Sequence, residues 1–172
     1  MVFLVISDSH GDRAALSSLI LRHKDVDAVF FLGDGIAEVE GLAAEGLPMP
    51  VIAVRGNCDS LSSPYGFPRE EELALTFCGR RLLLLHGHTA GAKGGLGGLV
   101  AAGRRHDADA VLFGHTHKAC DLYVPEGEGG PMWLLNPGSL GHPEDGVPSY
   151  GLLTLDDRGD LLFSIGKQRR GL

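Results

Sequence analysis

The chain has 172 residues, 44% of them hydrophobic and 22% charged, and its formal net charge is −7. These values are ordinary for a water-soluble globular protein, and the length predicts a single domain over residues 1–172. No apolar run approaches the roughly 20 residues of a membrane span, and the negative charge argues against tight binding of long nucleic acid, which depends on lysine and arginine neutralising phosphates.

The first predicted strand begins at Val2, which leaves no room for the basic region and cleavage site of a signal peptide. The three cysteines, Cys58, Cys78 and Cys120, are widely spaced and form no CxxC pair. Such spacing fits a reducing compartment and argues against a structural zinc site. We therefore expect a cytoplasmic protein.

The first half of the chain alternates short apolar strands with helices. The predicted strands are Val2–Ile6, Ala28–Leu32 and Val51–Val54, and the predicted helices lie near Arg13–Arg22, with Asp12 as its N-cap, and near Ala37–Ala44. Continuous apolar strands separated by helices are typical of parallel strands that are buried on both faces.

The second half is richer in strands. An irregular loop over Ser60–Arg69 leads to a predicted hairpin, and a glycine-rich stretch over Gly91–Gly98 leads to a predicted helix near Leu99–His106. The predicted strands are Glu72–Phe77, Arg81–Leu85, Val111–Phe113, Ala119–Val124, Trp133–Leu135, Tyr150–Leu155 and Leu161–Ile165. Together these elements predict an α/β fold, a four-layer αββα sandwich of two mixed β-sheets flanked by helices.

Five of the predicted strands end in a polar cluster. The clusters are Asp8-Ser9-His10, Gly33-Asp34, Gly56-Asn57-Cys58-Asp59, His86-Gly87-His88 and Gly114-His115-Thr116-His117. In an open α/β sheet the ligand crevice lies just beyond the carboxyl ends of the strands, so we expect these side chains around one rim. Each cluster alone is more typical of a turn, a helix cap or a surface histidine. Five together indicate a metal centre, with about the number of ligands that two ions need.

The ligand types indicate the metal and the chemistry. Imidazole, carboxylate and amide groups together suit manganese, iron, cobalt, nickel or zinc better than calcium or magnesium. Asp34 has two carboxylate oxygens and could bridge two cations. Two cations roughly 3.5–4 Å apart stabilise the attacking and leaving oxygens of an in-line displacement, and they lower the pKa of a shared water. The natural substrate of such a centre is a phosphate ester.

A competing motif follows the strand that ends at Leu85. The segment Gly87–Gly94 loosely matches a nucleotide-binding P-loop, G-x-x-x-x-G-K-[ST]. However, Ala92 stands where the second glycine is required, and Gly94 replaces the hydroxyl residue that holds magnesium. We therefore interpret the segment as a flexible loop beside the metal centre, whose backbone N–H groups could approach the substrate.

In their order along the chain, the five clusters resemble the motif set of the calcineurin-like metallophosphoesterases. The short length, the Gly56–Asp59 motif and the later Asn136-Pro137-Gly138-Ser139 are similar to the small single-domain phosphodiesterases of bacteria and archaea. The resemblance implies that one metal is held by Asp8, His10, Asp34 and His117, and a second by Asp34, Asn57, His86 and His115. It also implies a rim loop at Asn136–Ser139, which is either a Pro-Gly turn or a contact to substrate.

The resemblance implies a dinuclear metal-dependent phosphoesterase, more specifically a phosphodiesterase that hydrolyses a small phosphodiester with a metal-bound hydroxide. Manganese is the expected metal, with nickel, iron, cobalt and zinc as alternatives. The expected catalytic residues are Asp34, Asn57, Asp59 and His88, of which His88 is not a metal ligand but is expected to face the phosphate. The expected partner is a small phosphate-ester substrate, and the sequence leaves open whether the chain forms a homo-oligomer.

One position departs from the wider family. Many members have histidine where this chain has Cys58, and that histidine is thought to protonate the leaving group. A thiol near cations tends to ionise rather than donate a proton, so general-acid catalysis is not expected here. Asp59, which would orient such a histidine, is expected to support Asn57 or His10 instead. The remaining histidines are expected to be ordinary surface residues: His23, His106 and His142.

A non-catalytic protein-binding scaffold of the same fold is the alternative function, since the retromer subunit with this fold resembles such a case. An eroded ligand set would favour the scaffold. In this chain all seven ligand positions carry suitable residue types, which favours the enzyme.

Overall fold

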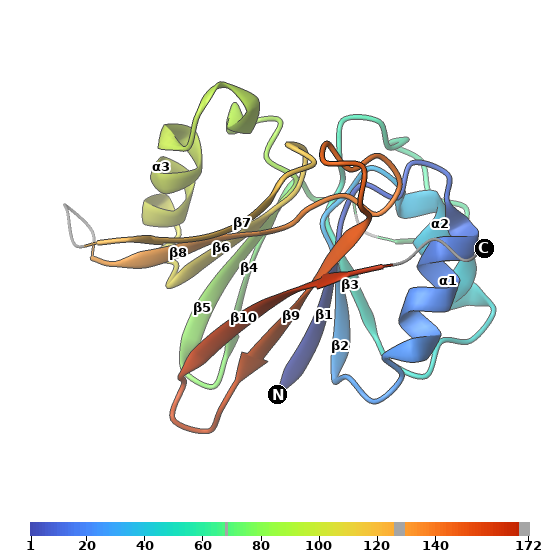
Figure 1. The fold of residues 1–172 in the computed structure, drawn as a ribbon, viewed down its shortest axis with the longest axis horizontal. Coiled ribbons are helices and arrows are strands. Elements are labelled where there is room, and N and C mark those ends of the chain that lie inside the picture. Colours follow the sequence, from blue (N-terminus) through green and yellow to red (C-terminus); the bar gives the residue numbers. More distant parts are fainter. Residues whose placement is uncertain (68, 126–129, 169–172) are drawn as a thin grey trace.

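The computed structural model describes residues 1–67, 69–125 and 130–168. Within these residues, two five-stranded sheets lie against each other with helices on their outer faces (Figure 1). The strands are β1 (Val2–Ile6), β2 (Ala28–Phe31), β3 (Val51–Ala53), β4 (Glu72–Phe77), β5 (Arg80–Leu85), β6 (Ala110–Phe113), β7 (Ala119–Val124), β8 (Met132–Pro137), β9 (Ser149–Leu155) and β10 (Leu161–Lys167). The helices are α1 (Arg13–Arg22), α2 (Ile36–Ala44) and α3 (Gly97–Arg105), with a short 3-10 helix, η1 (Ala92–Gly94).

Both sheets are mixed, as the sequence predicts. The first has the order β10-β9-β1-β2-β3, in which β1, β2 and β3 run parallel and β9 and β10 pair antiparallel. The second has the order β4-β5-β6-β8-β7, with parallel β5, β6 and β8 between antiparallel edge strands. The expected four-layer αββα sandwich is therefore confirmed.

The register of the parallel strands brings their carboxyl ends to one level. Ile6 of β1 pairs with Phe31 of β2, so the chain leaves both strands side by side. Leu85 of β5 pairs with Phe113 of β6 in the same way in the second sheet. The segments that follow these four strands carry four of the five polar clusters, and the fifth follows β3.

The strands are apolar along their whole length because each face is buried. In β1, Phe3 and Val5 face the layer between the sheets, where the ring of Phe3 stacks on Phe30 with centroids 4.4 Å apart. The alternate residues, Leu4 and Ile6, pack in the layer formed with α1 and α2. A strand buried on both faces shows no alternation of polar and apolar residues.

The outer layers rest on short apolar helix faces. Leu16, Leu19 and Ile20 of α1 are fully buried against the first sheet. On the second sheet, α3 lies so close that a Cβ at Gly103 would meet the Val111 side chain at 2.7 Å. Of the described residues, none belongs to a helix long and apolar enough to cross a membrane.

Several element boundaries differ from the predictions. Asp12 caps α1 as expected, since its carboxylate accepts the N–H of Ala15 at 3.0 Å. However, α2 begins one residue earlier than predicted and α3 two residues earlier, and the glycine-rich stretch contains η1. Asn136 and Pro137 are the last residues of β8 and not part of a loop. The pairing of Ala119 with Pro137 in the β7–β8 ladder extends the strand that far.

Candidate metal centre

The backbone turns sharply where the chain leaves the strands. Five of the predicted ligands have a positive φ between 45° and 66°, a region that residues with a side chain seldom adopt. They are Asp8, His10, Asp34, His115 and His117. Non-glycine residues in this conformation carry a conformational cost and cluster at functional sites. Five of the seven described non-glycine residues with a positive φ therefore lie at this rim.

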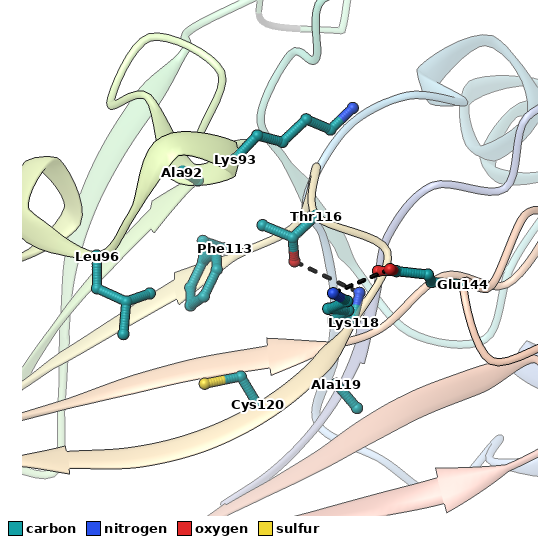
Figure 2. Close-up of a pocket in the computed structure, with 9 residues that line it drawn as sticks. All are labelled: Ala92, Lys93, Leu96, Phe113, Thr116, Lys118, Ala119, Cys120 and Glu144. Carbon is teal, nitrogen blue, oxygen red and sulfur yellow. Dashed lines mark hydrogen bonds and ion pairs between the residues drawn. The ribbon is translucent and has the colours of Figure 1, made fainter.

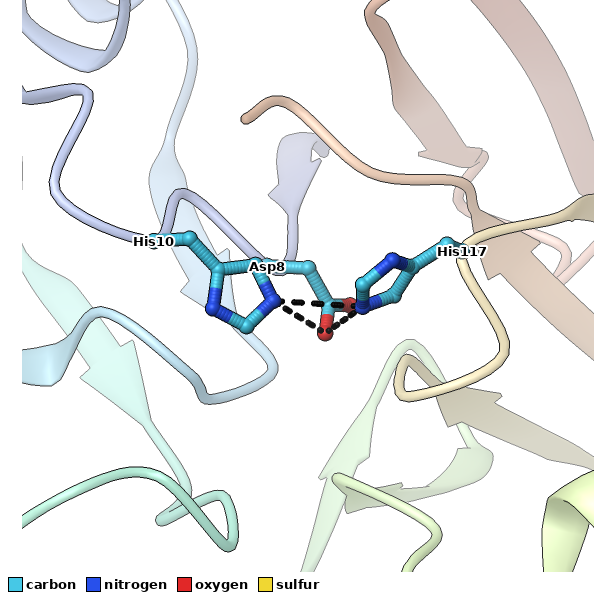
Figure 3. Close-up of side chains that lie close together, drawn as sticks. All are labelled: Asp8, His10 and His117. Carbon is cyan, nitrogen blue, oxygen red and sulfur yellow. Dashed lines mark hydrogen bonds and ion pairs between the residues drawn. The ribbon is translucent and has the colours of Figure 1, made fainter. Parts of the chain in front are cut away.

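The first group of side chains joins β1 to the segment after β6. Asp8, His10 and His117 lie close together and point toward one another (Figure 3). Asp8 Oδ1 lies 3.1 Å from His117 Nε2 and 3.7 Å from His10 Nε2. The two imidazole nitrogens are 3.2 Å apart.

The second group joins the segments after β2, β5 and β6. It contains Asp34, His86 and His115, whose potential ligand atoms all lie within 4.8 Å of one another. His86 Nε2 is 3.3 Å from Asp34 Oδ2. The same Asp34 oxygen is 4.0 Å from His10 Nε2 of the first group. Asp34 therefore lies between the two groups, as expected of a bridging carboxylate.

The hydrogen bonding of the two groups fits cations. Asp8 Oδ1 and His86 Nε2 are buried, and neither makes a hydrogen bond of acceptable geometry within the described residues. Each of the two atoms nevertheless lies close to another potential ligand atom: Asp8 Oδ1 is 3.1 Å from His117 Nε2, and His86 Nε2 is 3.3 Å from Asp34 Oδ2. The paired atoms therefore point toward a shared position that an ion would occupy, and not toward each other. Atoms bound at about 2.1 Å to one ion lie roughly 3.0–3.5 Å apart, which is the spacing of the closest pairs here. The residues thus fit a pair of divalent ions.

A layer of hydrogen bonds behind these side chains fixes their orientation. His86 Nδ1 lies 2.7 Å from the Leu32 carbonyl, and this contact places the ring proton on Nδ1 and leaves Nε2 as the lone-pair atom. The other oxygen of Asp8, Oδ2, accepts from Ser7 Oγ at 2.5 Å and from the N–H of His115 at 3.1 Å. Asp8 Oδ1 and His86 Nε2, the atoms of these two residues that face the centre, are therefore left for a cation.

The ionisation of the centre follows from its opposite charges. Burial alone would raise the pKa of Asp34, but the contact with His86 and its charge, together with the N–H of Cys58, hold that pKa well below its usual range. The pKa of His117 is raised above 6.5, first by its close contact with the Asp8 carboxylate. The pKa of His86 is also raised, because the contact with Asp34 and the charge of Asp8 outweigh the effect of burial.

Other histidines of the centre are held neutral. Burial, followed by the charges of His86 and Lys93, lowers the pKa of His115 to about 4. Burial also lowers the pKa of His10 and His88. Neutral imidazole is the form that binds a metal. Near neutral pH these rings are already neutral, so metal binding does not require them to lose a proton.

Asn57 differs from the other predicted ligands in its surroundings. Its side chain is exposed, and its amide nitrogen donates to Cys58 Sγ at 3.2 Å. This contact uses the amide nitrogen and leaves the carbonyl oxygen, which is the atom that binds cations. The close groups of His, Cys, Asp and Glu side chains contain the six other predicted ligands.

Cys58 is a potential donor that the sequence reasoning missed. Its sulfur lies in a close group with His10 and Asp34, within 4.8 Å. Desolvation of the thiol, together with the hydrogen bond and charge of Asp34, raises the pKa of Cys58 to about 11. Without bound cations the thiol is therefore protonated at neutral pH, and its ionisation beside cations stays a prediction.

Asp59 supports a different part of the centre from the one expected. Its carboxylate accepts four backbone N–H groups, those of Asp34, Gly35, Ile36 and Gly56, at 2.8–2.9 Å. It thus fixes the loop of Asp34 and the start of α2, where the sequence suggested support for Asn57 or His10. The motif spacing alone did not reveal this role because the bonds go to backbone atoms.

His88 lies at the edge of the centre in a chain of charged groups. Its Nε2 is 3.7 Å from Glu71 Oε1, and the same carboxylate oxygen pairs closely with the guanidinium of Arg55. His88 Nδ1 is buried and makes no hydrogen bond within the described residues. Glu71 and Arg55 were not singled out from the sequence.

The Asn136–Ser139 segment braces the centre from behind. The amide of Asn136 donates to the Gly114 carbonyl at 3.0 Å and to Thr116 Oγ1 at 3.1 Å. Ser139 Oγ donates to the Asp8 carbonyl at 2.9 Å. Both side chains are fully buried, so the segment supports the loops of Asp8 and His115 through hydrogen bonds.

The prediction for His142 was incomplete. The side chain is exposed as expected, but its ring stacks on His10 with centroids 4.8 Å apart and an interplanar angle of 21°. The backbone of His142 also forms a hydrogen bond with His117. His142 is therefore part of the edge of the centre, whereas His106 pairs with Glu72 at 3.0 Å away from it.

Known proteins share this sequence and fold. Residues 1–158 match the family model of the calcineurin-like phosphoesterase superfamily domain. The chain is 35% identical over 159 residues to the probable metallophosphoesterase YsnB of Bacillus subtilis, covering 91% of this chain and 86% of that protein. It is 39% identical over 113 residues to the phosphodiesterase YfcE of Escherichia coli, covering 62% of this chain and 53% of that protein.

Two solved structures extend the likeness in fold. A predicted phosphoesterase of Streptococcus pneumoniae superposes with a TM-score of 0.73 at 23% identity, covering 97% of both chains. Vps29 of Entamoeba histolytica, solved in complex with zinc, superposes with a TM-score of 0.70 at 23% identity, covering 97% of this chain and 99% of that one. With the family model matched over most of its length, the chain belongs to the calcineurin-like phosphoesterase superfamily.

Proposed function

We propose that the chain is a dinuclear metal-dependent phosphodiesterase that acts on a small phosphate ester. One ion would be held by Asp8, His10, Asp34 and His117, and the other by Asp34, Asn57, His86 and His115. The observation that carries the proposal is the position of Asp34 Oδ2, which is 4.0 Å from His10 Nε2 and 3.3 Å from His86 Nε2. One carboxylate thereby serves two groups of ligands.

The chain's own residues prepare the reaction in three ways. Two bound divalent ions would neutralise phosphate charge and make a water nucleophilic near neutral pH. The contact of His86 Nδ1 with the Leu32 carbonyl keeps the ring in the tautomer whose Nε2 has a free lone pair for a cation. Asp59 is a positioning residue, since its four hydrogen bonds hold the loop of Asp34. The ring of His88 lies beside the centre, with its centroid 5.5 Å from that of His86 and 6.1 Å from that of His115, and His88 is the residue we assign to a phosphate oxygen.

The presence of cysteine at position 58 leads us to expect that the enzyme prefers diesters with good leaving groups. The thiol stands where many members of the family have the histidine that is thought to protonate the leaving group, and a thiol beside cations tends to ionise rather than donate a proton. General-acid assistance is typically worth about 10²–10⁴-fold, and without it a leaving oxygen must depart largely as an anion. A diester phosphate carries one negative charge, so it also repels the nucleophile less than a dianionic monoester does.

The donor set supports a transition metal. Imidazole and carboxylate side chains make up both close groups, and this mixture suits first-row transition metals. We propose manganese first, with nickel, iron, cobalt or zinc as alternatives. We further propose that residues 1–172 work as one domain in the cytoplasm.

The test is hydrolysis with matched esters and metals. The metal-depleted protein is reloaded separately with manganese, nickel, iron(II), cobalt or zinc and assayed on bis(4-nitrophenyl) phosphate and on 4-nitrophenyl phosphate. We expect hydrolysis of the diester to exceed that of the monoester, and Asp34→Asn to abolish both. A preference for the monoester with every metal would overturn the phosphodiesterase assignment.

The alternative function is a protein-binding scaffold. The similarity of the fold to that of Vps29 supports considering a scaffold role, although this similarity concerns the fold alone. The six potential ligands that converge in the two groups argue for an enzyme, because a scaffold has no need to retain them. Absence of hydrolysis in a protein shown to hold two ions would support the scaffold.

A further inference from the structure

A pocket of about 490 Å³ lies beside the candidate metal centre (Figure 2). It is formed between the glycine-rich segment that contains η1 and the strands β6 and β7. Phe113 and Cys120 belong to the apolar layer that α3 makes with the second sheet. The pocket is therefore an open part of the outer face of that sheet, at the end where the polar clusters lie.

The pocket is continuous with the centre along the chain. Thr116, one of its lining residues, stands between the two potential ligands His115 and His117. Phe113, another lining residue, is the last residue of β6 before that turn. Lys93, a third lining residue, lies on the facing segment that contains η1. The pocket therefore borders the turn that carries His115 and His117.

The walls of the pocket suit an uncharged ring. Leu96, Ala119 and Cys120 contribute carbon and sulfur surface, and the buried Phe113 also borders the pocket. Figure 2 shows Leu96, Phe113 and Cys120 arranged around one space. Pockets for organic groups are typically apolar with a few polar atoms that fix orientation. A volume of 490 Å³ has room for one ring with its connecting atoms.

The two lysines of the pocket are not equivalent. Lys118 Nζ pairs with Glu144 at 2.9 Å, so its charge is already matched. Lys93 takes part in no ion pair among the described residues, and Figure 2 shows it extending above Thr116. Lys93 is thus the cation that is available to an anionic group at the mouth of the pocket.

We propose that this pocket binds one organic substituent of the phosphodiester, a flat apolar ring, while Lys93 pairs with the charge of the phosphate. The inference rests on the proposed function, and it narrows the substrate class to diesters with at least one aromatic substituent. An aliphatic diester fills the metal centre and leaves the apolar walls exposed to water.

The experiment compares two anions of equal charge. Methyl phenyl phosphate and dimethyl phosphate are titrated into the zinc-loaded protein, and binding is followed by ligand-observed NMR. Burial of the ring should make the phenyl compound bind roughly tenfold more tightly. Equal affinities would overturn the proposal, while dimethyl phosphate binding would still support the phosphate site. If neither anion binds to protein that holds its zinc, the proposed function and the pocket assignment both fail.

Variants test the named walls. Cys120→Phe fills the pocket and Leu96→Ala, at an exposed position, removes part of its wall; each should bring the affinity ratio of the two anions close to one. Leu122→Phe is the matched control, because Leu122 lies two residues along β7, is 40% exposed and does not line the pocket. Lys93→Met should weaken both anions by the same factor of about three. If both pocket variants show the same ratio of affinities for the two anions as the parent protein, the proposal is overturned.

Discussion

Asp59 holds the backbone of Asp34 from a different loop. Asp59 Oδ2 accepts the N–H of Asp34 at 2.8 Å, and Oδ1 of the same carboxylate accepts those of Gly35 and Ile36. The N-terminus of α2 has no side-chain cap of its own, so Asp59 supplies the cap from outside the helix. One carboxylate therefore fixes both the helix start and the residue that lies between the two ligand groups.

Replacing Asp59 should destabilise the protein even without metal. Asp59→Ala leaves four backbone N–H groups without their acceptor, and we expect a loss of about 3 kcal/mol in the free energy of unfolding. Asp59→Asn keeps one acceptor oxygen and should lose less. The measurement is guanidinium unfolding of the metal-free protein, with Asp121→Ala as an exposed control on β7. An Asp59→Ala midpoint equal to that of the control would show that these hydrogen bonds contribute little.

Gly56→Ala should disturb the centre without removing a ligand. A Cβ at Gly56 would lie 2.1 Å from Asp34 Oδ1 and 2.5 Å from the Asp34 nitrogen, so Asp34 must move. We expect metal affinity to fall by about tenfold or more, as it does when groups that orient ligands are changed. Gly97→Ala is the control, because a Cβ there meets nothing within 4 Å. Unchanged metal affinity in Gly56→Ala would show that the position of Asp34 tolerates displacement.

Cys58 should determine how the rate depends on the leaving group. The parent enzyme is expected to favour aryl diesters and to act slowly on alkyl diesters, because Cys58 stands where a histidine general acid would give proton assistance. Cys58→His should raise the rate mainly for poor leaving groups, and Cys58→Ala should stay active. The measurement is a series of rates across leaving-group pKa for the three proteins.

The outcome for Cys58→Ala separates two roles of the sulfur. The thiol lies close to His10 and Asp34, so it is also placed to contact an ion. An inactive Cys58→Ala that still holds both metals would assign the thiol a direct role in the reaction. An inactive variant that has lost metal would assign it to the ligands.

Metal affinity should weaken as the pH falls. In the metal-free protein the pKa values of His86 and His117 are raised above 6.5, so protons compete with metal for both rings below those values. Affinity should then decrease by about tenfold per pH unit for each of the two rings, while His115, with a pKa of about 4, does not contribute. Activity should decline below about pH 6. Competition titrations with manganese between pH 8 and pH 5.5 test this, and a constant affinity across that range would contradict it.

Much of the fold was predictable because its signals are local. Apolar runs such as Val2–Ile6 have the length of strands that are buried on both faces, and Asp12 stands directly before a helix. The start of α2 was placed one residue too late because its cap, Asp59, lies far along the chain. No local pattern reports such a contact.

The candidate ligands were predictable from their place after the strands, whereas their supports were not. Asp8, Asp34 and His86 follow directly from parallel strands whose ends lie at one level. Glu71 beside His88 and the stacking of His142 on His10 depend on how distant loops fold back. Loops of this kind carry no period that a sequence pattern can detect.

The most direct test of the account is the metal content of Asp34→Ala. The parent protein, equilibrated with manganese and passed through a desalting column, should hold two ions per chain by elemental analysis. Asp34→Ala should hold none tightly, because Asp34 Oδ2 lies between His10 and His86 and serves both groups, while the Asp121→Ala control should hold two. Two tightly bound ions in a folded Asp34→Ala protein would contradict the bridging role of Asp34, on which the proposed centre rests.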